Sequence, residues 1–216
     1  MLHLDPGVYA IVWTSVYISL TAVTLSALVM VPLGVLISLK SFTGKSILLQ
    51  ILNTLMALPT VVVGLLLYGI LTRPGPMGEY GLLYTPVAMI LGQWLLVSPI
   101  ICNLSIATVS SADPRLHITC MSLGAGIWQQ GLVFMSELRI GLMAAVVAGF
   151  GRAIGEVGVA MMLGGNIEGF TRTMTTAIAL ETSKGEFELA LALGMLLLLV
   201  AFVVNGFLYR LQRTTS

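Results

Sequence analysis

The sequence predicts an all-α integral membrane protein with five transmembrane helices, and three observations support this class. First, 57% of the 216 residues are hydrophobic and only 9% are charged. A soluble domain carries roughly 25% charged residues, so this chain must present apolar side chains to lipid. Second, five stretches reach the length of about 20 apolar residues that a membrane-spanning helix needs. Third, if these stretches cross a membrane, most Lys and Arg residues fall on the same side of it.

The expected spans cover residues 10–39, 46–71, 85–110, 141–164 and 187–209, and together they make residues 1–216 a single transmembrane domain. The first span is too long for the apolar region of a signal peptide, so we expect it to be retained. The first three spans show no polar group with a clear functional signal, and we expect them to act as scaffold and lateral wall.

Orientation follows from the distribution of the 10 Lys and Arg residues. Three of them fall on one side of the spans and Arg152 lies inside a span. The other side receives Lys40, Lys45, Arg115, Arg139, Arg210 and Arg213. Because cytoplasmic loops carry the excess of Lys and Arg, this side is predicted to be cytoplasmic. The N-terminus is therefore expected outside and the C-terminus inside.

Composition and motifs exclude several other functions. A net charge of +1 without any basic run argues against a nucleic-acid partner. Cys-x-x-Cys and His-x-x-x-His spacings are absent, so we expect no metal site and no cofactor bound by this chain. Gly44-Lys45-Ser46 is similar to the end of a phosphate-binding loop, but Leu39 occupies the position of its first glycine. Nucleophile elbows are also absent. We therefore expect this chain not to be an enzyme.

The loop 111–140 is too polar to cross a membrane, yet it keeps apolar residues at helical spacing. Asp113-Pro114 suits the start of a helix, with a capping side chain followed by proline at the first helical position. Glycines at positions 124, 126 and 131 are expected to break the loop into short pieces. We predict two short amphipathic helices near the membrane face. An interfacial helix that merely rests on lipid remains an alternative.

Arg152 and Glu156 lie four residues apart in the fourth predicted span, so they share one face of a helix. Each charge alone would cost about 2.5–3.5 kcal/mol at the centre of the membrane, and pairing lowers that cost. An ion pair that only locks helix packing is one explanation. Because ionisable groups inside membranes usually mark pathways or gates, a functional role is favoured.

Small residues form a stripe beside this pair, at Ala144, Ala148, Gly151, Gly155 and Gly158. Their spacing of three and four allows close crossing with another helix, within one subunit or across a dimer. Since the stripe and the charged pair flank each other, a change in packing could reorient the pair. This is a hypothesis about gating.

After the fourth span, Gly164-Gly165-Asn166 offers residues that tolerate the left-handed conformation at a helix end. Hydroxyls and one guanidinium follow, from Thr171, Arg172, Thr173, Thr175 and Thr176. Such groups suit a dianionic tetrahedral oxyanion. Ordinary helix capping is the alternative for any single threonine.

The segment Ser-Leu-Gly-Ala-Gly at 122–126, followed by an apolar stretch, resembles the cytoplasmic docking loop of ABC-importer permeases. Only the Leu-Gly-Ala centre of that family's motif survives. Ile118, Thr119 and Cys120 stand where Glu-Ala-Ala would be, and Phe134, Ser136 and Glu137 stand where Ile, Leu and Pro would be. The resemblance implies that the ATPase docks on Ser122, Leu123, Gly124, Ala125, Trp128 and Phe134.

Residues 141–194 show a more specific resemblance, to the permeases of the molybdate and tungstate branch. It is carried by the Arg-Ala-Ile-Gly-Glu-Val-Gly run at 152–158, by Gly-Gly-Asn-Ile at 164–167 and by the Thr-rich segment after them. The variant with Met-Met and Gly-Gly-Asn-Ile is most similar to tungstate permeases. The close resemblance covers roughly residues 110–200. It implies a pathway or gate formed by Arg152, Glu156, Asn166, Thr171, Arg172 and Thr173.

The resemblance further implies a multi-pass protein of a bacterial or archaeal cytoplasmic (inner) membrane. Its partners would be a second copy of the chain, two copies of an ABC ATPase that uses the ATP, an extracytoplasmic oxyanion-binding protein and membrane lipid. A secondary transporter or channel that uses Arg152 and Glu156 as an ion relay is the alternative. Such proteins usually contain inverted repeats, and the sequence shows none.

Overall fold

The structure is a computed structural model that describes residues 6–214, so residues 1–5 and 215–216 of the predicted domain lie outside the described part. Within it the chain is helical and contains no strand. The helices are α1 (Pro6–Leu39), α2 (Lys45–Met56), α3 (Thr60–Leu71), the 3-10 helix η1 (Gly78–Tyr80), α4 (Pro86–Ser110), α5 (Pro114–Ser122), α6 (Ile127–Glu137), α7 (Arg139–Ile154), α8 (Gly158–Gly164), α9 (Met174–Lys184) and α10 (Phe187–Thr214).

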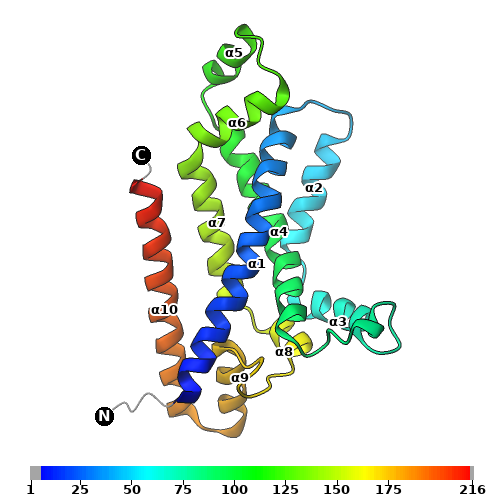
Figure 1. The fold of residues 1–216 in the computed structure, drawn as a ribbon, viewed down its shortest axis with the longest axis vertical. Helices are drawn as coiled ribbons and strands as arrows, with labels where there is room; N and C mark the ends of the chain where they lie inside the picture. Colours follow the sequence, from blue (N-terminus) through cyan, green and yellow to red (C-terminus); the bar gives the residue numbers. More distant parts are fainter. Residues whose placement is uncertain (1–5, 215–216) are drawn as a thin grey trace.

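Helices α1 and α4 pack along their length and form the centre of the bundle, with α7 and α10 beside them (Figure 1). Glycine allows this close approach, since a Cβ atom at Gly34 would lie 2.8 Å from the carbonyl oxygen of Cys102. A buried hydrogen bond of 3.2 Å between Ser26 and Ser98 also joins the two helices. Helices α1, α4 and α10 are each long and apolar enough to cross a membrane. The described residues reach up to five spans if two bent pairs, α2 with α3 and α6 with α7, each count as one span. The structure therefore supports an integral membrane protein.

Two of the predicted spans are not continuous helices, so that part of the prediction is wrong. Within 46–71, α2 and α3 meet at 95°. Pro59 causes this break, because proline has no N–H for the helical ladder and disfavours helix at the residue before it. Within 141–164, α7 ends at Ile154 and α8 begins at Gly158.

The loop 111–140 forms two short helices, α5 and α6, which confirms that part of the prediction; their place near the membrane face stays a prediction. Asp113 accepts a hydrogen bond of 2.8 Å from the backbone N–H of Arg115 and so caps α5. Gly124 turns the chain with a φ of 71°. Gly131 lies inside α6, so the expectation of a third break there is wrong. Helix α6 then meets α7 at 76°.

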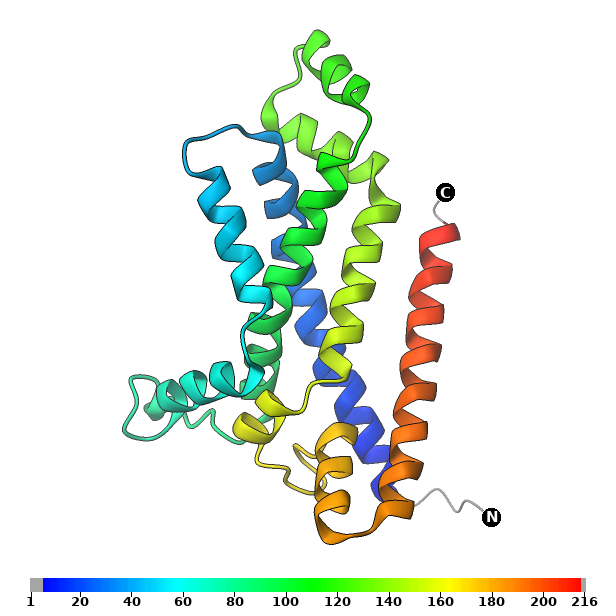
Figure 2. The same ribbon diagram turned by 180° about the vertical axis from the view of Figure 1, so that it is seen from behind.

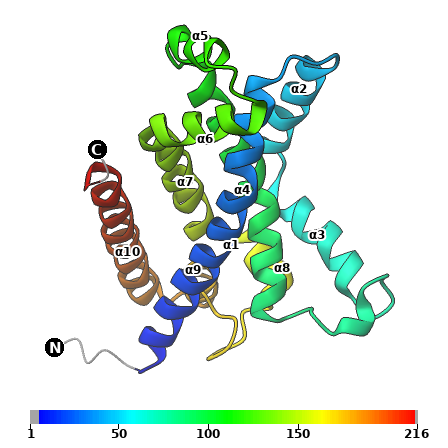
Figure 3. The ribbon, with the colours of Figure 1, turned by 45° about the horizontal axis from the view of Figure 1, so that its top comes forward.

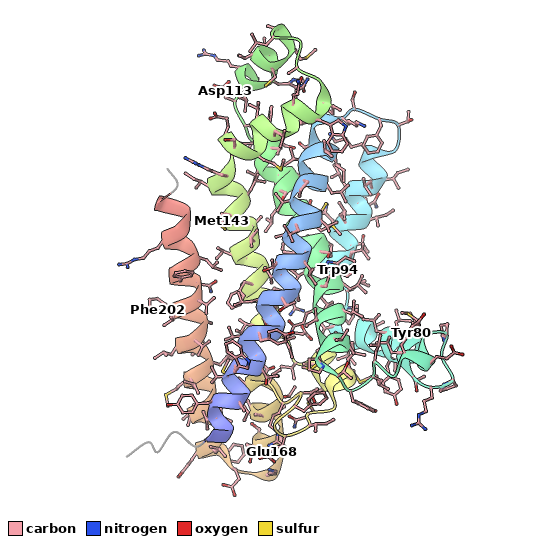
Figure 4. All side chains as sticks on the ribbon, in the orientation of Figure 1. Tyr80, Trp94, Asp113, Met143, Glu168 and Phe202 are labelled. Atoms are coloured by element: carbon pink, nitrogen blue, oxygen red, sulfur yellow. The ribbon has the colours of Figure 1, made fainter. Side chains whose placement is uncertain are left out.

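The molecule has two distinct ends (Figure 3). One carries α5 and α6 and is called the α5 end; the other carries α8 and α9 and is called the α9 end. Figure 4 shows Asp113 at the α5 end and Glu168 at the α9 end. Seen from behind, α2, α4 and α7 stand side by side in front of α1, while α3 projects sideways from the bundle and α8 lies toward the α9 end (Figure 2). We call the surface that α2, α4 and α7 turn away from α1 the α4 face.

Candidate functional site

The ion pair between Arg152 and Glu156 lies where α7 ends. Its Nη1 and Oε2 atoms are 2.6 Å apart, so the predicted contact is present. The side chain of Glu156 is 3% exposed and that of Arg152 is 39% exposed. The pair does not lie on one continuous helix, because Glu156 belongs to the irregular segment 155–157. The carboxylate is thus buried, and the guanidinium stays accessible from one side.

Glu156 connects three helices through separate atoms. Its Oε2 binds Arg152 on α7, and its Oε1 accepts a hydrogen bond of 3.1 Å from the backbone N–H of Val159 in α8. Its carbonyl oxygen accepts a 2.7 Å hydrogen bond from the Thr175 hydroxyl of α9. A carboxylate at the positive end of a helix is stabilising. Glu156 therefore holds the joint at which α7, α8 and α9 meet.

The threonines near this joint bind within the chain. Thr173 caps the N-terminus of α9. Its hydroxyl accepts a hydrogen bond from the Thr176 backbone N–H, while the Thr176 hydroxyl accepts one of 2.9 Å from the Thr173 N–H. Thr171 is fully buried; its hydroxyl donates to the carbonyl of Gly164 and accepts from the N–H of Ile167. These contacts are those of helix capping and loop ordering. A pathway role for Thr171 and Thr173 stays a prediction.

Asn166 and Arg172 lie in the loop between α8 and α9, together with Thr171. Asn166 adopts a φ of 52°, and its buried Oδ1 atom has no hydrogen-bond partner among the described residues. The Nη1 atom of Arg172 lies 3.4 Å from the carboxylate of Glu168, and its buried Nε atom has no hydrogen bond within residues 6–214. Buried polar atoms are usually satisfied. This loop thus retains free hydrogen-bonding capacity at the α9 end.

The two helix breaks meet beside the ion pair. A Cβ atom at Gly158, the first residue of α8, would lie 2.7 Å from the hydroxyl of Thr60, the first residue of α3. Both breaks are open on one side, because Ala57 to Pro59 and also Gly155 and Val157 are exposed. Sequence reasoning missed the first break, and Pro59 inside an apolar run was the available signal.

The small-residue stripe lies mostly on an open surface of α7. Ala144, Ala148, Gly151 and Gly155 are exposed, and a Cβ atom at Gly151 would meet nothing within 4 Å. Gly158 differs, since it packs against α3. Packing of the exposed stripe within the chain is therefore not observed, and packing across a dimer remains the prediction.

The residues predicted to dock the ATPase separate into two groups. Leu123 and Trp128 are 80% and 70% exposed, and Ser122 and Gly124 are exposed beside them. Phe134 is 3% exposed; it packs in a core with Val35, Val109, Cys120 and Leu142, and Ala125 contacts this core. The α5 end thus exposes the apolar side chains of Leu123 and Trp128, which we call its apolar edge. Beneath them lies the buried core around Phe134, which we call its base. Phe134 belongs to the base that positions α5 and α6.

A hydrogen bond from the first residue of α9 to Ser15 of α1 contributes to the stability of the fold, and this contribution can be tested. Its hydroxyl accepts a 2.7 Å hydrogen bond from the buried backbone N–H of Met174 and donates to the carbonyl of Ile11. Ser15→Ala is expected to lower the free energy of unfolding by about 1–3 kcal/mol, because the Met174 N–H loses its acceptor. Denaturation of the purified protein in detergent measures this change. Thr21→Val is the matched control, since that hydroxyl is exposed and binds only its own helix at Tyr17; equal stability of the two variants would contradict the prediction.

Comparison with known proteins gives close relatives over nearly the whole chain. No protein-family model matches it. It is 41% identical over 212 residues to the tungstate uptake system permease protein of Peptoclostridium acidaminophilum, covering 98% of this chain and 93% of the relative. It is 40% identical over 197 residues to a probable anion ABC transporter permease protein of Haloferax volcanii, covering 89% and 85%. The molybdenum transport system permease protein of Escherichia coli is 27% identical over 93% of this chain and 95% of its own length.

The aligned region extends through α1, the bent pair α2 and α3, helices α5 and α6, and the ion-pair joint. The resemblance inferred from residues 110–200 therefore holds for the chain as a whole. The chain belongs to the permease family of ABC anion importers, in the branch that contains the tungstate uptake permeases.

Proposed function

We propose that this chain is the membrane-spanning subunit of a binding-protein-dependent ABC importer that carries a tetrahedral oxyanion, tungstate or its analogue molybdate, into the cytoplasm. A separate ATPase supplies the energy. The substrate class is proposed from the tungstate and molybdenum permeases among its relatives. Five spans, with the α5 end cytoplasmic and the α9 end outside, agree with the distribution of Lys and Arg.

One observation carries the proposal: two broken helix pairs meet beside an ion pair whose guanidinium is accessible. Irregular backbone at membrane depth occurs only where protein covers it or where it lines a watery cavity. The exposed break at 57–59 and the exposed residues Gly155 and Val157 must therefore turn away from lipid. A pathway between two copies of the chain provides the protein and the water that these breaks require.

The joint has the chemistry that an oxyanion needs. Arg152 offers a guanidinium, and the first residue of α3, Thr60, places its hydroxyl against the first residue of α8 beside the ion pair. Toward the outside, Asn166 and Arg172 retain unsatisfied polar atoms in the α8–α9 loop. We assign them to the mouth that receives the oxyanion from an extracytoplasmic binding protein.

The α5 end supplies the mechanical connection to the ATPase. Exposed Leu123 and Trp128 would enter a groove of that partner, and each chain carries one such edge, so two chains engage two ATPases. Helix α6 continues into α7 through a single bend, and the far end of α7 bears Arg152. Movement of α5 and α6 during ATP hydrolysis would therefore shift the ion-pair joint and alternate the opening of the pathway between the two sides.

The exposed stripe of α7 makes a prediction about assembly. Gly151→Leu is expected to leave the fold intact, because its side chain enters open space in a single chain. In a homodimer it would instead meet the second copy and shift the assembly toward monomers. Size-exclusion chromatography with light scattering in mild detergent measures the shift. Gly206→Leu on α10, where a Cβ atom also meets nothing within 4 Å, is the control; an unchanged dimer for both variants would contradict the proposed interface.

Oxyanion uptake by cells tests the function itself. A strain that lacks this chain is expected to lose uptake of radiolabelled tungstate and to regain it when the wild-type chain is supplied. Parallel measurements with molybdate show which oxyanion is preferred. Retention of tungstate and molybdate uptake in the strain without this chain would contradict the proposal. No observation favours the alternative of an ion-relay transporter.

A further inference from the structure

We infer that Asn53 of α2 and Asn103 of α4 form a transient binding site, which holds the oxyanion by hydrogen bonds between the ion-pair joint and the α5 end. The inference rests on the proposed transport function, and it assigns a role to two helices that the sequence marked only as scaffold. Four features of the structure support it: the free donors of the pair, the polar side of α2, the lack of Asp and Glu on α2, α4 and α7, and its place between two cationic groups.

The two carboxamides face each other across α2 and α4. The Nδ2 atom of Asn103 donates a hydrogen bond to Oδ1 of Asn53 and lies 3.1 Å from the sulfur of Met56. This contact uses one acceptor of Asn53 and leaves its NH2 group without a hydrogen bond among the described residues. Asn53 is exposed and Asn103 is half-buried. The pair is therefore held in place by its own contact, and Asn53 keeps N–H donors that are free to bind a ligand.

Helix α2 has a polar side that continues from this pair. Gln50, Asn53 and Thr54 follow the three- and four-residue spacing of one helix face, and no residue of α2 is buried within the chain. The Thr54 hydroxyl donates to the Gln50 carbonyl of its own helix, whereas the Gln50 carboxamide and the Asn53 NH2 group have no hydrogen bond among the described residues. Polar groups without partners are costly to place against hydrocarbon. This side of α2 therefore belongs against water, as the wall of a vestibule between two copies of the chain would.

Charge along the α4 face suits an anion. Helices α2, α4 and α7 contain no Asp or Glu. Lys45 begins α2 at the α5 end, with its ammonium bound to the carbonyl oxygens of Ser38 and Lys40, and Arg152 lies near the other end of α7. An anion that moves between these two cations meets no repelling carboxylate on the three helices.

A neutral donor between two cations serves transport better than a third cation would. Hydrogen bonds from charged donors are roughly twice as strong as those between neutral groups, so a cation at this point would slow release. Asn53 lies eight residues beyond Lys45, about 12 Å along the helix at 1.5 Å per residue. The carboxamide pair thus offers an intermediate contact that orients the oxyanion and lets it leave toward the cytoplasm.

The test measures ATP-driven tungstate uptake by proteoliposomes that contain the whole importer, with its ATPase and binding protein. Asn53→Asp keeps the size of the side chain and adds a negative charge, so uptake is expected to fall at least about tenfold through repulsion of the dianion. Asn53→Leu removes the donors without adding charge and is expected to have a smaller effect. Thr21→Val, on α1, is the control that keeps wild-type uptake, because that hydroxyl binds only its own helix at Tyr17. Uptake by Asn53→Asp within twofold of wild type would overturn the inference.

Thiol labelling gives a second measurement that does not depend on transport. In a chain whose own cysteines, Cys102 and Cys120, are replaced by alanine, Asn53→Cys is expected to react with a negatively charged, water-soluble thiol reagent, and tungstate should slow the reaction. Absence of reaction would show that the position is closed to water and would overturn the inference. If the wild-type importer takes up no oxyanion, the proposed function fails; if it does and both Asn53 variants behave as wild type, only this inference fails.

Discussion

Replacing Glu156 with leucine is expected to abolish oxyanion uptake and to destabilise the fold. The substitution leaves the Val159 N–H without its acceptor and Arg152 without its counter-ion. We expect a loss of about 1–3 kcal/mol in the free energy of unfolding from the unsatisfied N–H alone. Uptake should fall more than the amount of folded protein does, because Arg152 would no longer be held at the joint. Denaturation in detergent and tungstate uptake, measured on the same preparation, separate the two effects.

Two companion variants identify the part played by charge. Glu156→Gln keeps an oxygen that can accept from Val159, so its stability should lie closer to wild type while uptake stays impaired. Arg152→Leu combined with Glu156→Leu removes both charges, and its stability should exceed that of Glu156→Leu because no unpaired cation remains. Wild-type uptake by Glu156→Leu would show that the joint is not part of the pathway.

Placing aspartate at both Leu123 and Trp128 is expected to prevent the ATPase from binding and so to stop uptake. These side chains are 80% and 70% exposed, and their loss should leave the buried base around Phe134 intact. Removal of a pair of anchoring apolar residues from an interface costs about 2–4 kcal/mol or more, which corresponds to an affinity loss of at least roughly thirtyfold. Co-purification of the ATPase with the tagged permease measures the loss.

The control for the docking variant is Tyr80→Asp. Tyr80 is 71% exposed and lies beyond the tip of α3, away from the α5 end (Figure 4). It should therefore leave ATPase binding unchanged. Retention of the ATPase by the double aspartate variant would mean that the partner docks elsewhere, and the mechanical connection through α6 and α7 would have to be abandoned.

Features set by neighbouring residues could be read from the sequence. Asp113-Pro114 predicted the start of α5, because both the cap and the proline act within one helical turn. The contact of Arg152 with Glu156 followed from their spacing of four residues, which brings them together even though the helix ends between them. Family membership could also be read, since the motif at 152–167 is local.

Features set by tertiary contacts could not be read in this way. The 95° turn between α2 and α3 is an exception, because Pro59 was a local signal for it; hydropathy alone still predicted one span over 46–71. The end of α7 at Ile154 depends on Glu156 binding α8 and α9 at once, and pattern rules treat such a residue as part of the helix. Asn53 and Asn103 are 50 residues apart, and only the packing of α2 on α4 brings them together.

The most direct test of the central claim is tungstate uptake into proteoliposomes that contain this chain with and without its ATPase. The account predicts uptake only when the ATPase, ATP and the loaded binding protein are all present. It also predicts that Arg152→Leu, assembled with the same partners, loses that uptake. Uptake by this chain alone, driven by an ion gradient and insensitive to ATP, would contradict the account and would favour an ion relay through Arg152 and Glu156.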